Sequence, residues 1–259
     1  MNTATRAVRR LWDDAAVIYD QAIVPALADT HRAVRSLLGD VDGARALDLG
    51  CGTGVLAQML AEGGATVTAV DLAPHMVELA QRRLAAFPSV ERVAVMDAQA
   101  LQLPDAAFDV VGASLSLMFC PDHAAAFAQA RRVLRPGGRF AMACWATPDE
   151  CETVTVGRVT AAFATGPAPT GTPTGQSLGD GAVLRGLLEG AGFLDIDMMK
   201  RGVRLRYPGA DALWQAMLHV NGERIPADRV EDARRATMAE IARVGLPLRN
   251  SCWLVAARA

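Results

Sequence analysis

The chain has 259 residues, of which 51% are hydrophobic and 21% charged, and its formal net charge is −2. This composition excludes a disordered chain, which would combine low hydrophobicity with high net charge. It also lacks the strongly basic character of proteins that bind nucleic acids or anionic lipids, while the length suffices for one large α/β domain.

The first part of the chain is predicted to be helical. Apolar residues recur at helical spacing over residues 5–38, and Pro25 either divides this region or starts a helix. Strands and helices then alternate, which predicts right-handed crossovers and a mostly parallel, doubly wound sheet. The strands are expected at 44–49, 66–70, 92–96, 108–113 and 139–145, and the helices at 55–62, 74–87 and 122–134.

The pattern changes after residue 146. The stretch Thr165–Gly175 is rich in Pro, Gly and Thr and is expected to be a loop that opens and closes. We expect a strand over 193–207 with a bulge or turn at Gly202, and a single domain over residues 1–259. Further helices are expected at 180–189, 210–219 and 227–244, and a last strand at 252–257. The parts of this domain are N-terminal helices (1–43), a ligand-binding core (44–145), and the second half of the sheet with lid insertions (146–259).

Targeting and metal-binding signals are not found. The N-terminus has no apolar signal-peptide core, and no apolar stretch reaches the roughly 18 residues of a membrane span. The cysteines are odd in number, widely spread and without a CxxC pair, so neither a disulfide framework nor a metal site is predicted. We therefore expect a cytoplasmic protein, and the excess of arginine over lysine is typical of a GC-rich bacterial genome. The five cysteines are Cys51, Cys120, Cys144, Cys151 and Cys252.

The strongest motif is ALDLGCGTG, residues 46–54. Three glycines follow a buried strand, and the helix that starts near Val55 offers free N–H groups and a positive dipole end, which suit an anionic fragment. The spacing of Gly50, Gly52 and Gly54 is GxGxG, whereas dinucleotide enzymes use GxGxxG. This spacing disfavours an NAD-dependent oxidoreductase, which remains one alternative. The other alternative is a turn that needs its glycines only for backbone geometry and binds no ligand.

Asp71 ends the next strand, about 20 residues after the glycine turn. A carboxylate there can accept two hydrogen bonds from a ribose diol. Dinucleotide enzymes share this feature, so Asp71 does not discriminate between ligands. The alternative role is to cap the helix that follows.

The ordered set of motifs resembles the class I S-adenosylmethionine-dependent methyltransferases, in particular the small-molecule group of the ubiquinone and menaquinone biosynthesis type. Asp48 with the glycine turn is similar to motif I, and the resemblance continues through VAVMDAQALQLP (93–104) and SLSLMFCPDHAAAFAQARRVLRPGG (114–138). It implies a seven-stranded sheet in the order 3-2-1-4-5-7-6 with the last strand antiparallel, a helical lid, and S-adenosylmethionine as the cofactor.

The resemblance also implies residue roles. In this family an acid after the third strand receives the adenine amine and the next backbone N–H meets a ring nitrogen, which here falls on Asp97 and Ala98, with Gln99 close by. Tyr19 would cover the cofactor together with Trp12, or else simply pack an amphipathic helix. The implied cofactor-binding residues are Tyr19, Asp48, Gly50, Cys51, Gly52, Gly54, Asp71, Leu72, Met76, Asp97, Ala98, Gln99 and Ser114.

The implied reaction is in-line methyl transfer to a small, largely apolar or aromatic metabolite, which depends mainly on positioning. A non-catalytic S-adenosylmethionine-binding protein is the second alternative. The only candidate base is His219, and Trp214 either lines the acceptor pocket with other lid residues or packs the lid. Neither the methylated atom nor the oligomeric state is fixed by the sequence. The arginines expected on a solvated helix face, rather than in a nucleic-acid patch, are Arg131, Arg132, Arg135 and Arg139.

Overall fold

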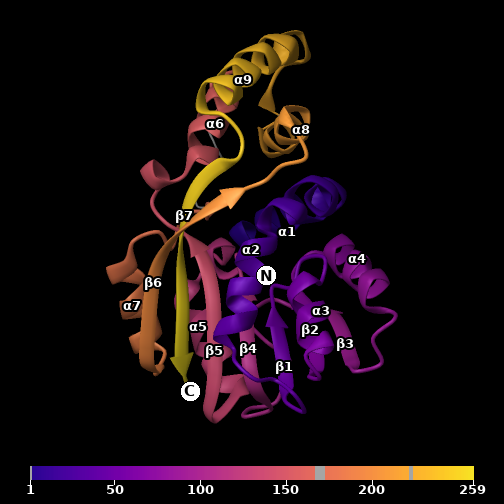
Figure 1. Ribbon diagram of the computed structural model, residues 1–259, viewed down its shortest axis with the longest axis vertical. Coiled ribbons are helices and arrows are strands. Elements are labelled where there is room, and N and C mark those ends of the chain that lie inside the picture. The colour runs from indigo at the N-terminus through magenta and orange to yellow at the C-terminus, as the bar shows by residue number, and fades with distance from the viewer. Residues whose placement is uncertain (1, 167–172, 222–223) are drawn as a thin grey trace.

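A seven-stranded sheet forms the centre of the computed structural model, which describes residues 2–166, 173–221 and 224–259. The strand order is β3-β2-β1-β4-β5-β7-β6, which confirms the order predicted from the family resemblance (Figure 1). The first five strands pair in parallel, and β7 is antiparallel to both of its neighbours, also as predicted. The strands are β1 (Arg45–Leu49), β2 (Thr66–Asp71), β3 (Val90–Val95), β4 (Phe108–Ser114), β5 (Leu134–Trp145), β6 (Leu194–Leu205) and β7 (Leu248–Arg258).

The direction of strand addition reverses between β1 and β4. The chain first builds outward from β1 to β3 and then returns to add β4 and β5 on the other side. Because parallel crossovers are right-handed, this reversal places α3 (Val55–Glu62) and α4 (Pro74–Leu84) on one face and α5 (His123–Val133) on the other. Such a reversal opens a crevice at the carboxyl ends of the two central strands, where open α/β sheets bind ligands.

The N-terminal region is two helices joined by an irregular turn. α1 (Thr3–Ile18) and α2 (Val24–Leu37) are separated by a π-helical turn at Tyr19–Ile23, and Pro25 lies in the first turn of α2, as expected for a proline that starts a helix. α2 packs beside α3, whereas α1 lies across the carboxyl edge of the sheet next to α4 (Figure 1).

Two polar contacts hold this region on α4. The backbone N–H of His75 donates to Asp13 Oδ1 at 2.7 Å. Arg83 donates through Nη2 to Asp20 Oδ1 at 2.6 Å, and both side chains of this pair are 29% exposed. The N-terminal helices are therefore fixed over the sheet edge.

A helical cap stands beyond the sheet on the extended ends of β6 and β7 (Figure 1). It consists of α6 (Glu152–Ala161), α8 (Ala210–Asn221) and α9 (Val230–Val244). α6 was not predicted, because its sequence ETVTVGRVTA is rich in β-branched residues that favour strands. Residues 167–172 of the predicted mobile loop lie outside the described residues. α7 (Gly181–Gly190) packs separately, against β6 and α5.

The register between β6 and β7 differs from the prediction. The predicted irregularity at Gly202 is wrong: Gly202 pairs in register with Ser251, and the register shifts between Leu194 and Asp197 instead.

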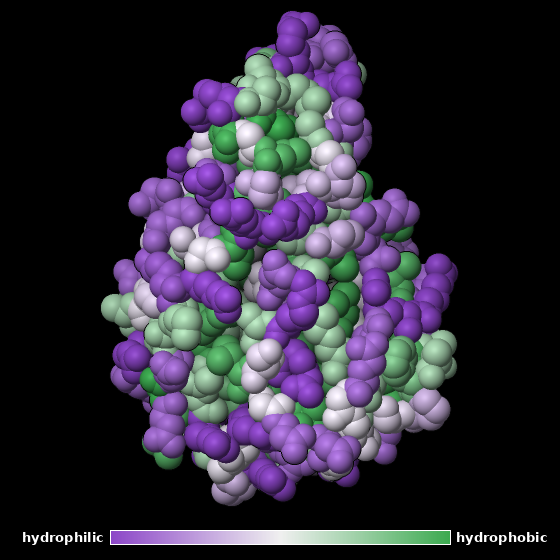
Figure 2. Space-filling model, viewed as in Figure 1, coloured by the Kyte–Doolittle hydropathy of each residue, from purple (hydrophilic) through white to green (hydrophobic). Residues whose placement is uncertain are grey.

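The surface mixes hydrophilic and apolar residues. The two kinds alternate over the face seen in Figure 2, so the apolar surface there is broken into small patches. None of the helices described is long and apolar enough to cross a membrane.

The cap has a small core of its own, centred on Trp214. This side chain is 2% exposed and packs with Ile225 and Ala233, and the partly buried Phe163 and Met238 pack against this cluster. The interpretation of Trp214 as an acceptor-pocket residue is therefore wrong, and the alternative, that it packs the lid, is correct.

We predict that Trp214→Ala lowers the free energy of unfolding by about 3–5 kcal/mol, because it leaves a large cavity in the cap. Chemical denaturation measures this loss. Cofactor affinity of the folded variant should match that of the wild type. Trp12→Ala, in α1, is the matched tryptophan variant and should lower cofactor affinity instead, because Trp12 lines the cavity at the strand ends. Unchanged stability of the Trp214 variant would contradict the assignment.

Candidate cofactor-binding site

A cavity opens at the carboxyl ends of β1, β2, β3 and β4, beneath α1 and the π-helical turn. It encloses about 850 Å³, counting its open mouth. Every residue that the sequence predicted to bind cofactor lines this cavity except Gly54. The fold thus brings together residues from four strand ends and from the N-terminal helices, which are up to 95 positions apart (Tyr19 to Ser114).

The glycine turn needs glycine for two separate reasons. Gly50 has a φ of +74°, and a Cβ placed there would lie 2.4 Å from Ser116 Cβ, so any side chain would collide with the loop after β4. Gly54 has a φ of +88°, and a Cβ placed there would lie 3.2 Å from Ala80 Cβ. Gly54 therefore serves the close packing of α3 on α4 and is not among the residues that line the cavity.

Asp71 at the end of β2 already accepts backbone hydrogen bonds. Its Oδ2 accepts from Gly52 N–H at 2.8 Å and its Oδ1 from Ala73 N–H at 2.9 Å. Each carboxylate oxygen has a second acceptor site, so both can still receive a hydroxyl. Burial raises the pKa of Asp71, and backbone donors at Ala73, Gly52 and Leu72 oppose that rise. The residue thus holds the glycine turn and keeps acceptor capacity toward the cavity.

Asp48 in β1 is 1% exposed and supports the other side of the turn. Its Oδ2 accepts from Ala57 N–H, in the first turn of α3, at 2.8 Å. Burial, opposed by the hydrogen bond from Ala57 N–H and assisted by the nearby Asp71, raises the pKa of Asp48 to about 7. A buried acid with this pKa is partly protonated near neutral pH.

We predict that Asp48→Asn changes the pH dependence of stability. The folded-state pKa of about 7 lies above the usual value of 3.8, so the folded protein holds a proton that the unfolded chain has lost, and stability falls as pH rises from about 4 to 7. The amide stays neutral and keeps an acceptor for Ala57. Across this window the wild type should lose up to about 4 kcal/mol more than the variant.

Urea unfolding at several pH values measures this difference. Burial and Arg83 lower the pKa of His31 to about 4, so His31 has the opposite pH dependence, but it is present in both proteins and cancels. Parallel stability curves for the two proteins would show that Asp48 is ionised in the folded state.

Asp97 after β3 is held by the side chain of Gln99. Asp97 Oδ1 accepts from Gln99 N–H at 2.9 Å and from Gln99 Nε2 at 2.8 Å, while Gln99 Oε1 accepts from Asp122 N–H at 2.8 Å. Asp122 is the N-cap residue of α5, and its side chain accepts a hydrogen bond from Ala125 N–H. These contacts use Asp97 Oδ1, so Asp97 Oδ2 can accept a hydrogen bond from a ligand. Gln99 links the loop after β3 to α5.

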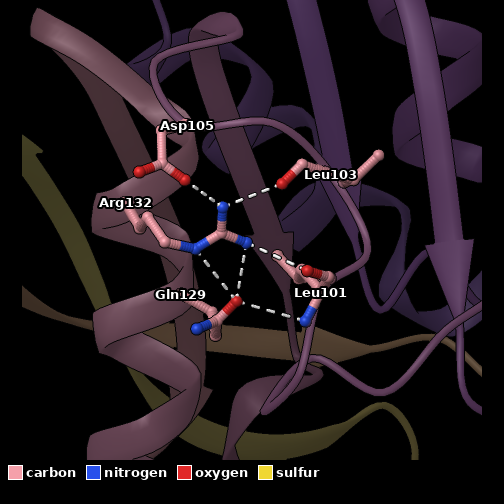
Figure 3. Close-up of polar contacts among 5 residues, drawn as sticks. All are labelled: Leu101, Leu103, Asp105, Gln129 and Arg132. Atoms are coloured by element: carbon pink, nitrogen blue, oxygen red, sulfur yellow. Dashed lines mark hydrogen bonds and ion pairs between the residues drawn. The ribbon is translucent and has the colours of Figure 1, made fainter.

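Arg132 fixes the rest of this loop onto α5 (Figure 3). Its guanidinium donates to the carbonyl oxygens of Leu101 at 3.0 Å and Leu103 at 2.8 Å, and it also contacts Asp105 and Gln129. Only 29% of its side chain is exposed. The expectation that Arg132 belongs to a solvated helix face is therefore wrong, because its donors satisfy backbone carbonyls of a loop that has no regular structure.

We predict that Arg132→Met loosens residues 97–105 and lowers the affinity for S-adenosylhomocysteine by about fivefold, or about 1 kcal/mol. Hydrogen exchange should show weaker amide protection in this loop, and calorimetry gives the affinity. Arg131→Met is the matched control, since Arg131 donates instead to Gly192 O near β6. Equal affinity and protection in both variants would contradict a role for Arg132 in ordering the loop.

Three aromatic rings close the outer side of the cavity. The ring centroid of Trp12 lies 5.5 Å from that of Tyr19 and 4.8 Å from that of Phe119, both in edge-on geometry. Tyr19 Cε1 lies 3.5 Å from where Gly52 would carry a Cβ, so the phenol ring lies against the glycine turn. Burial and the nearby Asp71 and Asp48 raise the pKa of Tyr19, which keeps its hydroxyl protonated.

The sequence interpretation missed His31. This residue of α2 is 5% exposed, lines the cavity, and its Nδ1 lies 2.8 Å from Ser114 Oγ at the end of β4. The apolar face of α2 gave no signal that separates it from a packed core histidine. His219, the expected base, lies on α8 and is not among the residues that line the cavity.

Comparisons with known proteins agree with this geometry. A family model described as a methyltransferase domain matches residues 47–142. Nocamycin O-methyltransferase from Saccharothrix syringae is 31% identical over 252 residues, covering 88% of this chain and 87% of that protein. The chain belongs to the S-adenosylmethionine-dependent methyltransferases.

Other relatives match less of the chain or share only the fold. Malonyl-[acyl-carrier protein] O-methyltransferase from Serratia marcescens is 38% identical over 133 residues, so the alignment spans 51% of this chain and about half, 50%, of that methyltransferase. Phosphoethanolamine N-methyltransferase 2 from Haemonchus contortus, solved with S-adenosyl-L-methionine, superposes with a TM-score of 0.56 at 18% identity, covering 89% of this chain and 52% of that one. S-adenosylmethionine is the cofactor that this family implies.

Proposed function

We propose that this methyltransferase transfers the methyl group of S-adenosylmethionine to an oxygen atom of a small, largely apolar or aromatic metabolite. The observation that carries the proposal is the cavity itself, in which acids from the ends of β1, β2 and β3 share one space with the glycine turn. The name of the nocamycin relative, which aligns with most of the chain, supports oxygen as the acceptor atom.

The cofactor would lie along the strand ends. Asp97 Oδ2 and the N–H of Ala98 face the adenine, Asp71 accepts from the ribose hydroxyls, and the glycine turn meets the amino-acid portion. Leu72 and Met76 line the same side of the cavity, and Met76 is 2% exposed, which suits contact with the apolar faces of the nucleoside. The positions of these residues around the cavity support this arrangement.

The acceptor would use the remaining apolar lining. Val8 from α1, Leu115 and Leu117 after β4, and Phe119 form this part of the cavity. A wall of this kind desolvates an apolar acceptor and orients it by shape, with few polar contacts. When bound, the sulfonium cofactor supplies an activated methyl group, and the chain itself provides alignment and excludes water.

The alternatives are weaker. The glycine spacing and the acid after β3 are methyltransferase features, and no comparison supports an NAD-dependent oxidoreductase. A non-catalytic cofactor-binding protein is distinguished by turnover. A cytoplasmic location and a bacterial source also stay proposals, supported by the arginine-rich composition and by bacterial relatives.

The turnover test uses methyl-labelled S-adenosylmethionine with 2-naphthol, 2-naphthylamine and 2-naphthalenethiol as matched acceptors. We expect label on the oxygen acceptor. Label found only on the nitrogen or sulfur acceptor would contradict the proposal that the methylated atom is oxygen. Tight cofactor binding without transfer to any acceptor would support the non-catalytic alternative.

We predict that Asp97→Asn reverses or abolishes a preference for S-adenosylhomocysteine over S-inosylhomocysteine. The carboxylate accepts from the adenine amine, whereas the amide can donate to the inosine carbonyl. The wild type should prefer the adenosyl ligand by at least about tenfold, or 1.4 kcal/mol, in calorimetry. Asp71→Asn is the matched control and should weaken both ligands equally. An unchanged preference in the Asp97 variant would leave this residue without a role in reading the base.

A further inference from the structure

The cavity contains one buried polar atom that the protein itself leaves without a partner. Two buried side-chain atoms in the described part of the chain make no hydrogen bond, His31 Nε2 and Thr53 Oγ1. Only His31 belongs to the residues that line the cavity. A buried polar atom without a hydrogen bond is energetically unfavourable. Such an atom in the wall of a binding cavity therefore points to a ligand atom that forms the hydrogen bond.

The position of His31 along the sheet identifies which part of the ligand it meets. Asp97 follows β3, Asp71 ends β2, the glycine turn follows β1, and Ser114 ends β4, so the four sites follow the strand order β3-β2-β1-β4. Three interstrand spacings of about 4.8 Å separate the ends of this row, about 14 Å in total. With adenine at β3 and ribose at β2, the amino-acid end of the cofactor reaches β1 and β4.

Charge then distinguishes the two groups at that end. The ammonium group suits the neighbourhood of Asp48 and Asp71, whose carboxylates accept hydrogen bonds. The carboxylate group would be repelled there and needs donors on the opposite side, toward α2. Because burial and Arg83 lower the pKa of His31 to about 4, this ring is neutral at pH 7 and offers one N–H without adding a cation next to the sulfonium.

We propose that His31 Nε2–H binds the carboxylate of the cofactor's amino-acid end, and that Ser114 sets the required tautomer by donating its hydroxyl proton to Nδ1. Ser114 Oγ lies 2.8 Å from Nδ1, and when the hydroxyl is the donor in this contact the ring proton must lie on Nε2. Ser114 is thus a positioning residue, and the pair makes the site select ligands that retain the carboxylate. This inference rests on the proposed cofactor arrangement.

The experiment is a binding cycle with three probes. S-adenosylhomocysteine has the complete amino-acid end, S-adenosyl-3-thiopropylamine lacks only the carboxylate, and methylthioadenosine lacks the whole end. We expect His31→Leu to weaken S-adenosylhomocysteine by at least about tenfold and to leave the other two probes within twofold. His31→Gln keeps an N–H donor and should recover most of the loss, and Ser114→Ala should show a smaller, equally selective loss.

His219→Gln is the matched control, since this histidine lies on α8 and does not line the cavity. An equal loss for all three probes would assign His31 to packing, and no loss would remove it from the site; either result overturns the inference while leaving the cofactor assignment intact. Failure of the wild type to bind S-adenosylhomocysteine would instead reject the proposed function, and the inference with it.

Nitrogen NMR gives a second readout that does not depend on the folding of a variant. The chain has four histidines, so ¹⁵N-histidine labelling gives a small set of ring signals. We expect His31 to show a protonated Nε2 and an unprotonated Nδ1, and its Nε2 signal to shift with S-adenosylhomocysteine but not with methylthioadenosine. The opposite tautomer in the complex would overturn the inference.

Discussion

The turn between β1 and α3 is held in place by two carboxylates, those of the buried Asp48 and the half-buried Asp71, and the rest of the site depends on that constraint. Asp48 accepts from the first turn of α3, and Asp71 accepts from the glycine turn itself, so backbone N–H groups at the helix start have fixed positions. Because Gly50 has no side chain, the loop after β4 can approach within van der Waals contact. The strand ends therefore meet around one cavity.

The carboxylates that hold this turn face partial desolvation even before a ligand arrives. Burial raises the pKa of both Asp48 and Asp71, while backbone donors oppose the rise. A cationic ligand placed next to these acids would favour their ionised forms. The electrostatics of these acids thus suit a sulfonium cofactor. Arg83, the cation that helps to lower the pKa of His31, is itself paired with Asp20.

Polar side-chain contacts hold the segments around the cavity in place on both sides of the sheet edge. Gln99 joins Asp97 to the start of α5, and Arg132 satisfies two carbonyls of the same loop. On the other side, Asp13 and Asp20 fix the N-terminal helices to α4. The N-terminal helices therefore cover the cavity. The C-terminal cap packs around Trp214 and contacts α1 and the π-helical turn through α8.

Local sequence determined the elements of this protein that depend on interactions between residues close together in the chain. Alternating apolar runs fixed the strands and helices of the core, and glycine spacing with acids at strand ends marked the residues from Asp48 to Ser114, because those residue types are needed wherever a backbone turns tightly or a ribose is bound. Only the tertiary structure decided the roles of His31, Arg132 and Trp214. Each looks like an ordinary helical residue in sequence, and its function depends on which distant backbone, hydroxyl or cap side chain lies beside it after folding.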